Sequence, residues 1–326
     1  MTRLGYQIPN FTYPGATPAD LFPTVVRQAR AAEASGFDTV LVMDHFYQLP
    51  GLGRPENEML ECYTLLSALA QHTKRVRLSA LVTGNTYRNP ALLVKEVTTL
   101  DHVSGGRAQL GIGAGWFQLE HDSLGFEFGT FSDRFSKLEE SLQVIRGMLA
   151  GSRPSVDGRW YRVNDAINSP APLSKIPIMV GGGGEKKTLR LVALYADESN
   201  LICQPTEVAR KLDALAGHCG SIGRDRSEIL VTLQASCCVA PTHEQAVAEA
   251  GAYLAARGID LSSLSEAEAD QIRSQIVLGD PDEVGEIFSS RMVDGVDGFT
   301  VNSPANGHIE GRVELLGQVL RKVVHI

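Results

Sequence analysis

Histidine and acidic residues that could move protons stand directly after apolar runs of the chain. His45 follows Asp44 at the end of one run, and Glu120 and His121 follow another. Histidine can accept or donate a proton near neutral pH, and a carboxyl group or a second histidine could act as proton donor beside it. A hydrogen-bonded core histidine is the alternative for His45, and an exposed helix start is the alternative for Glu120 and His121.

The glycine run Gly181–Gly184 indicates a phosphate site. It follows the apolar segment 176–180 and precedes a segment of helical period. Backbone amides without side-chain crowding, next to a helix N-terminus, bind phosphate well. The nucleotide P-loop pattern is not met, because Lys186 stands where that pattern requires glycine. A cofactor phosphate therefore fits better than a transferred one, with a flexible connector as the alternative.

Short apolar runs alternate with helical segments throughout the chain. The predicted strands are 4–8, 39–43, 76–82, 108–112, 176–180, 199–202, 229–236 and 298–301. This alternation predicts a parallel sheet covered by helices, and eight such units favour a closed (β/α)8 barrel, or TIM barrel. An open doubly wound sheet is the alternative, but Trp116 stands where its Gly-x-Gly-x-x-Gly fingerprint needs the third glycine.

The helices predicted between these strands have recognisable ends. They cover 20–35, 59–71, 90–103, 133–149, 185–196, 206–219, 242–292 and 309–324. Pro90 opens one helix, and Gly36 and Gly105 follow the ends of two others. Alternation around Asp157–Gly158 predicts a β-hairpin within an insertion at about 151–175. We therefore expect one domain over residues 1–326 that contains this insertion.

The active site of a parallel barrel lies at the carboxyl ends of its strands. Three polar clusters fall at such ends: 44–46 after the second strand, 83–90 after the third and 113–116 after the fourth. We expect all three to face one mouth. Core packing is the alternative role for Trp116.

Composition and charge exclude several classes of protein. The formal net charge is −8 and basic residues are scattered, so we expect no nucleic-acid partner. No run of 18 apolar residues occurs and the first residues show no signal segment, so we expect no membrane association. The five cysteines lack Cys-x-x-Cys spacing, which favours a reducing cytoplasm with neither a metal site nor a disulfide framework.

Several motifs, taken in order, resemble the luciferase-like monooxygenase family over nearly the whole chain. They are Val-Met-Asp-His-Phe (42–46), Thr-Tyr-Arg-Asn-Pro-Ala-Leu-Leu (86–93), Leu-Asp-His-Val-Ser-Gly-Gly-Arg (100–107), Leu-Gly-Ile-Gly-Ala-Gly-Trp (110–116), Arg-Phe (134–135) with Leu-Glu-Glu (138–140), and Met-Val-Gly-Gly-Gly-Gly (179–184). The Tyr-Arg-Asn-Pro turn resembles the branch that uses the deazaflavin coenzyme F420 more than the branch that uses flavin mononucleotide (FMN).

The resemblance implies a homodimeric barrel that transfers hydride between F420 and a small organic substrate. His45 would approach the hydride-carrying face, and a non-proline cis peptide at or within one residue of Ala80–Leu81 would lie behind the ring. The cofactor-binding residues expected on this basis are Asp44, Ala80, Leu81, Thr83, Asn85, Ala114, Gly115, Trp116, Gly181, Gly182, Gly183 and Gly184. An FMN-dependent monooxygenase and a cofactor-free, non-enzymatic barrel subunit are the alternatives.

The chain also differs from one group of this family. Its glucose-6-phosphate dehydrogenases place a glutamate proton donor where this chain has Trp116. They place a lysine for the substrate phosphate after the strand that here ends Leu201-Ile202-Cys203, where this chain has Gln204–Glu207. A sugar phosphate is therefore disfavoured as the substrate.

Overall fold

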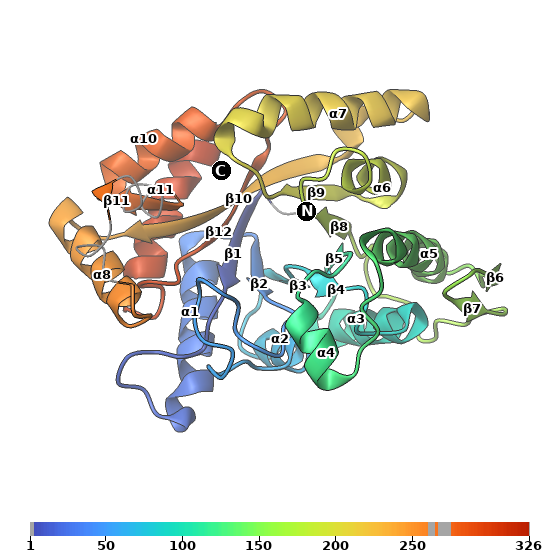
Figure 1. The fold of residues 1–326 in the computed structure, drawn as a ribbon, viewed down its shortest axis with the longest axis horizontal. Helices are drawn as coiled ribbons and strands as arrows, with labels where there is room; N and C mark the ends of the chain where they lie inside the picture. Colours follow the sequence, from blue (N-terminus) through green and yellow to red (C-terminus); the bar gives the residue numbers. More distant parts are fainter. Residues whose placement is uncertain (1–2, 260–264, 267–274, 326) are drawn as a thin grey trace. The chain divides into compact units, whose positions relative to one another are not determined.

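The computed structural model describes residues 3–259, 265–266 and 275–325. The chain divides into two compact units, and Figure 1 shows its course. Of the described residues, unit 1 comprises Val42–Phe46 and Glu61–Val231, and unit 2 comprises 3–41, Tyr47–Leu60 and the described part of 232–325. A single domain over residues 1–326 stays a prediction.

Unit 1 holds a parallel sheet of buried strands. These are β3 (Arg77–Ala80), β4 (Thr83–Gly84), β5 (Leu110–Gly113), β8 (Ile178–Gly181) and β9 (Glu198–Leu201). β5 pairs in parallel with β4 and β8, and β8 pairs in parallel with β9. The helices of this unit are α2 (Cys62–Ala70), α3 (Pro90–Ser104), α4 (Gln118–Leu124), α5 (Phe131–Leu149), α6 (Thr188–Tyr195) and α7 (Val208–Ser221). Strands that are buried along nearly their whole length are typical of a parallel sheet covered by helices.

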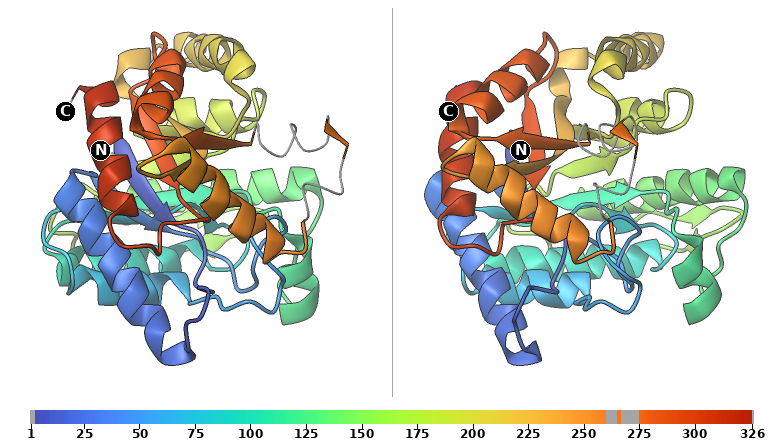
Figure 2. Two further views of the ribbon diagram at one scale, coloured as in Figure 1. Left: turned by 90° about the vertical axis from the view of Figure 1, so that its left-hand side faces the viewer. Right: turned by 60° about the vertical axis from the view of Figure 1, so that its left-hand side comes forward.

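Unit 2 is built in the same way. Its strands are β1 (Leu4–Ile8), β11 (Ile276–Gly279), β12 (Gly298–Asn302) and most of β10 (Leu230–Val239), while β2 (Thr39–Val42) has residues in both units. β12 pairs in parallel with β1 and β10, and β10 pairs in parallel with β11. The helices are α1 (Leu21–Ser35), α8 (His243–Ala255), α10 (Pro281–Arg291) and α11 (Arg312–Val324). α11 packs against α1, and Figure 2 shows the two helices side by side.

The eight predicted strands are all present in the described part of the chain, with ends shifted by a few residues. Predicted helix ends at Gly36 and Gly105 are also confirmed, since both residues adopt the left-handed conformation, with φ of 95° and 70°. Asn89 caps α3 by accepting a hydrogen bond from the Ala91 amide. The short helix α4 was not predicted.

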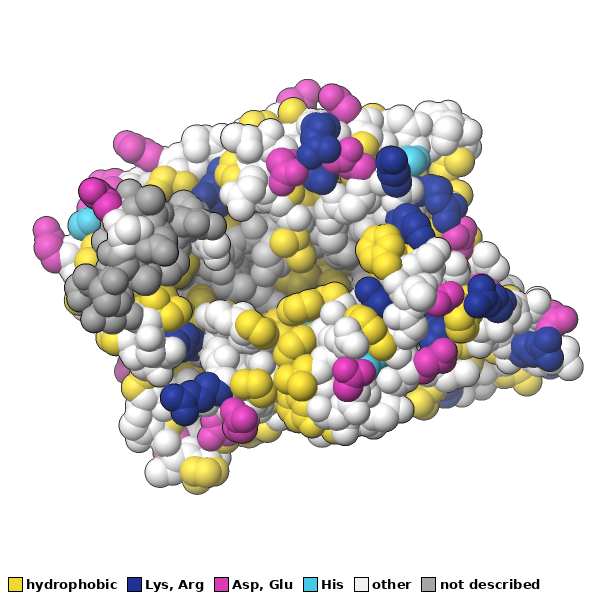
Figure 3. Space-filling view, in the orientation of Figure 1, with side chains coloured by type: hydrophobic (Ala, Val, Ile, Leu, Met, Phe, Trp, Pro, Cys, Tyr) yellow, Lys and Arg dark blue, Asp and Glu magenta, His cyan; other side chains and the backbone are white. Residues whose placement is uncertain are grey.

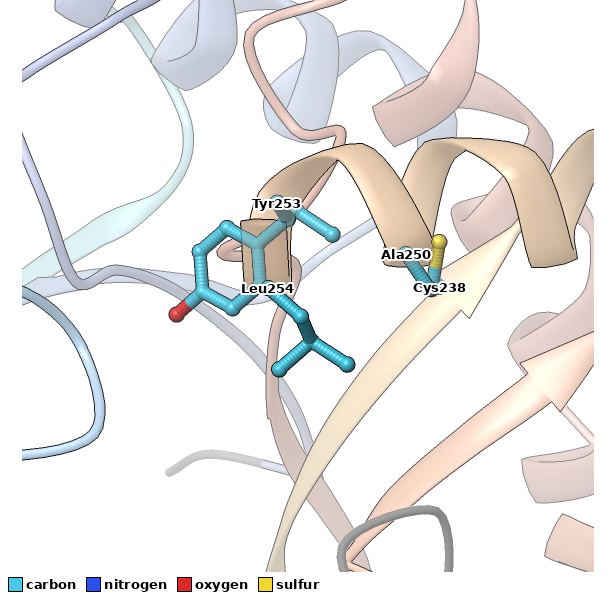
Figure 4. Packing of buried hydrophobic residues seen from close by; sticks show 5 residues of the cluster. Cys238, Ala250, Tyr253 and Leu254 are labelled. Atoms are coloured by element: carbon cyan, nitrogen blue, oxygen red, sulfur yellow. The ribbon is translucent and has the colours of Figure 1, made fainter. Parts of the chain in front are cut away.

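The prediction of one helix over 242–292 is wrong. Figure 4 shows α8 packed on β10 through a buried cluster of Cys238, Ala250, Tyr253, Leu254 and Ala305. Ile276 and Leu278 of β11 pack against the same cluster. A strand satisfies both this packing and the pairing with β10, and Asp280 then caps α10. Residues 260–264 and 267–274, also within that prediction, lie outside the described residues.

The predicted hairpin is confirmed as β6 (Val156–Asp157) paired antiparallel with β7 (Arg162–Val163). Its loop is longer than the predicted turn, and the Gly158 amide donates to the Tyr161 carbonyl at 3.0 Å. The Glu140 carboxylate of α5 accepts the backbone amides of 159, 160 and 161 at 2.8–3.0 Å. These hydrogen bonds hold the hairpin of the insertion against α5.

Glycines on β5 allow the preceding strand segment to pack closely. A Cβ on Gly111 would overlap the carbonyl oxygen of Ala80. A Cβ on Gly113 would lie 2.9 Å from one methyl carbon of Val82, and a Cβ on Gly181 of β8 would lie 2.8 Å from the other. Residues 111 and 113 point to the same side because side chains alternate along a strand. The Gly-Ile-Gly motif is therefore required by packing.

Gly111→Ala is predicted to lower the free energy of unfolding by about 1–3 kcal/mol, because a methyl group must displace backbone. Gly217→Ala in α7 is the matched control, since a Cβ there meets no atom within 4 Å. It should be neutral or stabilise the protein by about 0.5–1 kcal/mol. Urea unfolding of both variants measures the difference, and equal stabilities would contradict the packing requirement.

Candidate active site

The candidate active site lies in unit 1, where loops follow the carboxyl ends of β2, β4 and β5. His45 and Phe46 come after β2, and Thr86 and Tyr87 come after β4. The loop after β5 leads into α4, which carries Glu120. Parallel strands end at the same edge of a sheet, so these loops meet there.

Glu120 is a fully buried carboxylate at the centre of this cluster. Its Oε2 lies 2.8 Å from Nδ1 of His45 and also accepts from the Tyr87 hydroxyl, while Oε1 accepts from the Phe46 amide. A carboxylate in this position accepts, so His45 carries a proton on Nδ1. Nε2 is left as the nitrogen of His45 that can exchange a proton with a bound molecule.

Tyr87 is held as a hydrogen-bond donor. Burial and the adjacent Glu120 carboxylate raise the pKa of Tyr87, so its hydroxyl stays protonated. The Tyr87 ring also contacts the rings of Phe46 and Phe126, with centroids 5.1 and 5.2 Å away. From the sequence, Tyr87 is named only within the Thr-Tyr-Arg-Asn-Pro motif, and this role is not predicted. The place of Tyr87 in that motif, next to Arg88, is the feature that could have indicated it.

His121 is buried and both of its ring nitrogens have partners. Nδ1 lies 2.9 Å from the Phe117 carbonyl, which requires an N–H there. Nε2 lies 2.7 Å from the Thr86 hydroxyl, which therefore donates to it. An exposed helix start, the alternative for Glu120 and His121, is wrong for both.

Asp44 links the loop after β2 to the segment after β3 by hydrogen bonds to Arg88 and Gly84. Arg88 donates to its two carboxylate oxygens at 2.7 and 3.0 Å, and the Gly84 amide donates to Oδ2 at 3.0 Å. The Arg88 side chain, only 9% exposed, also pairs with Glu61 and Glu96. The predicted cofactor residue Asp44 therefore joins the end of β2 to β4 and α3.

Trp116 lies beside His45 with 58% of its surface exposed, so core packing is wrong for it. Its ring centroid is 5.9 Å from that of His45, at an interplanar angle of 71°. Gly115 before it has φ of 80°, and its carbonyl accepts from Arg134 at 3.1 Å. Ala114 is partly exposed in the same loop.

The remaining expected residues occupy other parts of the sheet. The predicted cis peptide is found at Leu81–Val82, within one residue of Ala80–Leu81. The Thr83 hydroxyl lies 2.6 Å from the Tyr63 hydroxyl of α2, and the Asn85 amide donates to the Gly113 carbonyl. The structure therefore brings together His45, Glu120, His121 and Trp116, while Thr83 faces α2.

The glycine run forms a turn after β8 and does not open α6 directly, because Glu185–Lys187 intervene. Gly182 has φ of 122°, and its amide donates to the Asn200 carbonyl. A Cβ on Gly183 would lie 2.8 Å from the Ile202 carbonyl oxygen. Backbone without side chains therefore lines this turn, which is partly exposed at 181–183 and exposed at Gly184.

The described residues contain neither a membrane-spanning helix nor a cluster of metal ligands. None of their helices has the length and apolar character needed to cross a membrane. No group of three or more His, Cys, Asp or Glu side chains among them could hold a metal ion.

Comparisons with known proteins match most of the chain. The sequence profile described as luciferase-like monooxygenase matches residues 2–306. An F420-dependent glucose-6-phosphate dehydrogenase of Segniliparus rotundus is 31% identical over 214 residues, which are 63% of this chain and 61% of that relative. The matched region thus spans about three fifths of the relative's length.

Two solved structures share the fold. An F420-dependent secondary alcohol dehydrogenase in complex with an F420-acetone adduct gives a TM-score of 0.79 at 21% identity and covers 99% of both chains. The FMN complex of the oxygenating constituent of 3,6-diketocamphane monooxygenase from Pseudomonas putida gives 0.74 at 18% identity and covers 98% of both. The predicted (β/α)8 barrel of luciferase-like type is confirmed by these likenesses.

Arg88→Met is predicted to lower the free energy of unfolding by about 3–5 kcal/mol, because it leaves the buried Asp44 carboxylate without its partner. Arg153→Met is the control, since Arg153 and Asp165 form a pair in which both side chains are 55% exposed. That loss should stay within about 1 kcal/mol. Chemical unfolding of both variants measures the two losses; similar losses would contradict the role assigned to the buried pair.

Proposed function

Because the chain belongs to the luciferase-like monooxygenase family, we propose that it is an oxidoreductase that transfers hydride between coenzyme F420 and a small organic substrate. The observation that carries this proposal is the His45 imidazole held at the strand ends by the buried Glu120. The 31% identity to an F420-dependent dehydrogenase supports the choice of coenzyme.

The residues present fit such a coenzyme. The turn Gly181–Gly184 is a cradle that side chains would fill, and it stands before α6. Amides near a helix start favour an anionic group, so this turn would hold the coenzyme phosphate. When bound, a deazaflavin accepts or gives a hydride, and the protein supplies binding, orientation and electrostatics.

His45 is the proposed proton-transfer residue. Its Nε2 would take the proton from a substrate hydroxyl during oxidation, or return it to the oxygen during reduction. Glu120 would act through His45, because its carboxylate stabilises the imidazolium that forms. His121 would position the loop through Thr86, since both of its nitrogens are already bonded within the protein.

Assembly and location extend the proposal. We expect a homodimer in the cytoplasm that binds a small-molecule substrate besides the coenzyme. The dimer rests on the family resemblance. The cytoplasm is supported by the five cysteines, all unpaired and four of them buried.

Titration of the purified protein with each coenzyme tests the proposal directly. We predict that F420 quenches tryptophan fluorescence to saturation and binds at least about 10-fold more tightly than FMN, a difference of about 1.4 kcal/mol. Tight FMN binding without F420 binding would make the protein an FMN-dependent monooxygenase. Binding of neither would favour a cofactor-free barrel subunit.

Substitutions in the His45–Glu120 pair test the proton transfer. His45→Ala should lower the single-turnover hydride-transfer rate by about 100-fold while the variant still folds and binds coenzyme. Glu120→Gln should cause a smaller loss, because the amide can still bond to His45 but no longer carries the negative charge that stabilises an imidazolium.

Thermal unfolding of the same variants is the control. Normal turnover of His45→Ala with a lowered melting temperature would remove His45 from the chemistry. An unchanged hydride-transfer rate for Glu120→Gln would reduce Glu120 to a structural role.

A further inference from the structure

Two aromatic rings lie next to the His45 imidazole. The rings of Trp116 and Phe117 both meet the His45 imidazole nearly edge-on, with centroids 5.9 Å away. Leu119 of α4 is 42% exposed next to them in the sequence. Figure 3 shows exposed hydrophobic side chains next to the place of α4 in unit 1. A molecule bound at His45 therefore lies close to an apolar surface.

Two arginines that contact the loops after β4 and β5 are already engaged. Arg88 is bound by the carboxylates of Asp44, Glu61 and Glu96. Arg134 donates to the carbonyl oxygens of Gly115 and Gly129, and its guanidinium lies 3.9 Å from the centroid of the Phe128 ring. A substrate phosphate would have to displace these contacts to reach either cation.

The loop after β9 presents a carboxylate. Glu207 accepts the backbone amide of Gln204 at 3.1 Å, and it pairs with Arg210. Arg210 also pairs with Glu185, so its charge is shared by two acids. Lys211 pairs with the same two acids, so both cations here are already engaged, and a substrate phosphate would have to displace a carboxylate to reach either one.

We propose that the substrate is a neutral alcohol, or the matching carbonyl compound, whose apolar ring packs on Trp116. This inference rests on the proposed function. In oxidation, the carbinol carbon gives its hydride to the coenzyme, the hydroxyl proton passes to Nε2 of His45, and the C=O bond forms; reduction runs the same transfers backward. An exposed indole beside the reacting group offers a flat surface for a ring, and stacking and burial there favour apolar molecules.

The test compares three hydride donors with the F420-loaded enzyme: 1-phenylethanol, 2-propanol and glucose 6-phosphate. The kcat/KM for 1-phenylethanol should exceed that for each of the others by about 10-fold or more. Trp116→Ala should raise the KM for 1-phenylethanol about 5-fold more than it raises the KM for 2-propanol. Trp116→Phe, which keeps a ring, should retain most of the preference.

A second readout does not depend on turnover. The chain has two tryptophans, so Trp160→Phe leaves Trp116 as the only indole, and acetophenone should quench its fluorescence whereas glucose 6-phosphate should not. Preference for glucose 6-phosphate, or a Trp116→Ala defect confined to F420 binding, would overturn the inference. Failure of F420 to bind the unaltered protein would instead overturn the proposed function, and acetophenone quenching would still decide the inference about Trp116.

Discussion

A carboxylate buried away from water must be surrounded by hydrogen-bond donors, and this requirement at Glu120 organises the candidate site. Its donors come from two loops, since His45 and Phe46 follow β2 and Tyr87 follows β4. Helix α4 supplies the carboxylate, and His121 in the same helix binds Thr86. The orientation of the His45 imidazole and the placement of α4 therefore depend on the same contact.

Periodicity predicted the strands well, because each is a short apolar run between helices of clear period. It could not predict that Glu120 meets His45, since this depends on α4, a helix of seven residues that is too short to show an apolar stripe. The orientation of Thr83 was equally hidden. Two residues separate β3 from β4, so the alternation of side chains in β3 does not fix which side Thr83 faces.

Much of what makes the sequence recognisable serves construction of the barrel. The side chain of Arg107 donates five hydrogen bonds, and four of them go to the backbone carbonyl oxygens of residues 70, 73, 76 and 104. Asp101 accepts the amides of Leu173 and Ser174, which holds the end of the insertion against α3. Arg88, in the turn that suggested a deazaflavin, is bound within an ion cluster. Such motifs identify the fold, whereas substrate choice depends on residues outside them.

Glu120 and Trp116 both contact the His45 imidazole. The His45 side chain is only 12% exposed and that of Glu120 is fully buried, so their hydrogen bond lies in surroundings shielded from water, where such interactions are stronger. The rings of Trp116 and Phe117 lie next to the same imidazole. An apolar substrate bound here would exclude further water from the His45–Glu120 pair, whereas a charged substrate would keep part of its hydration shell. The electrostatics of the pair and the apolar character of the surrounding surface therefore favour the same class of bound molecule.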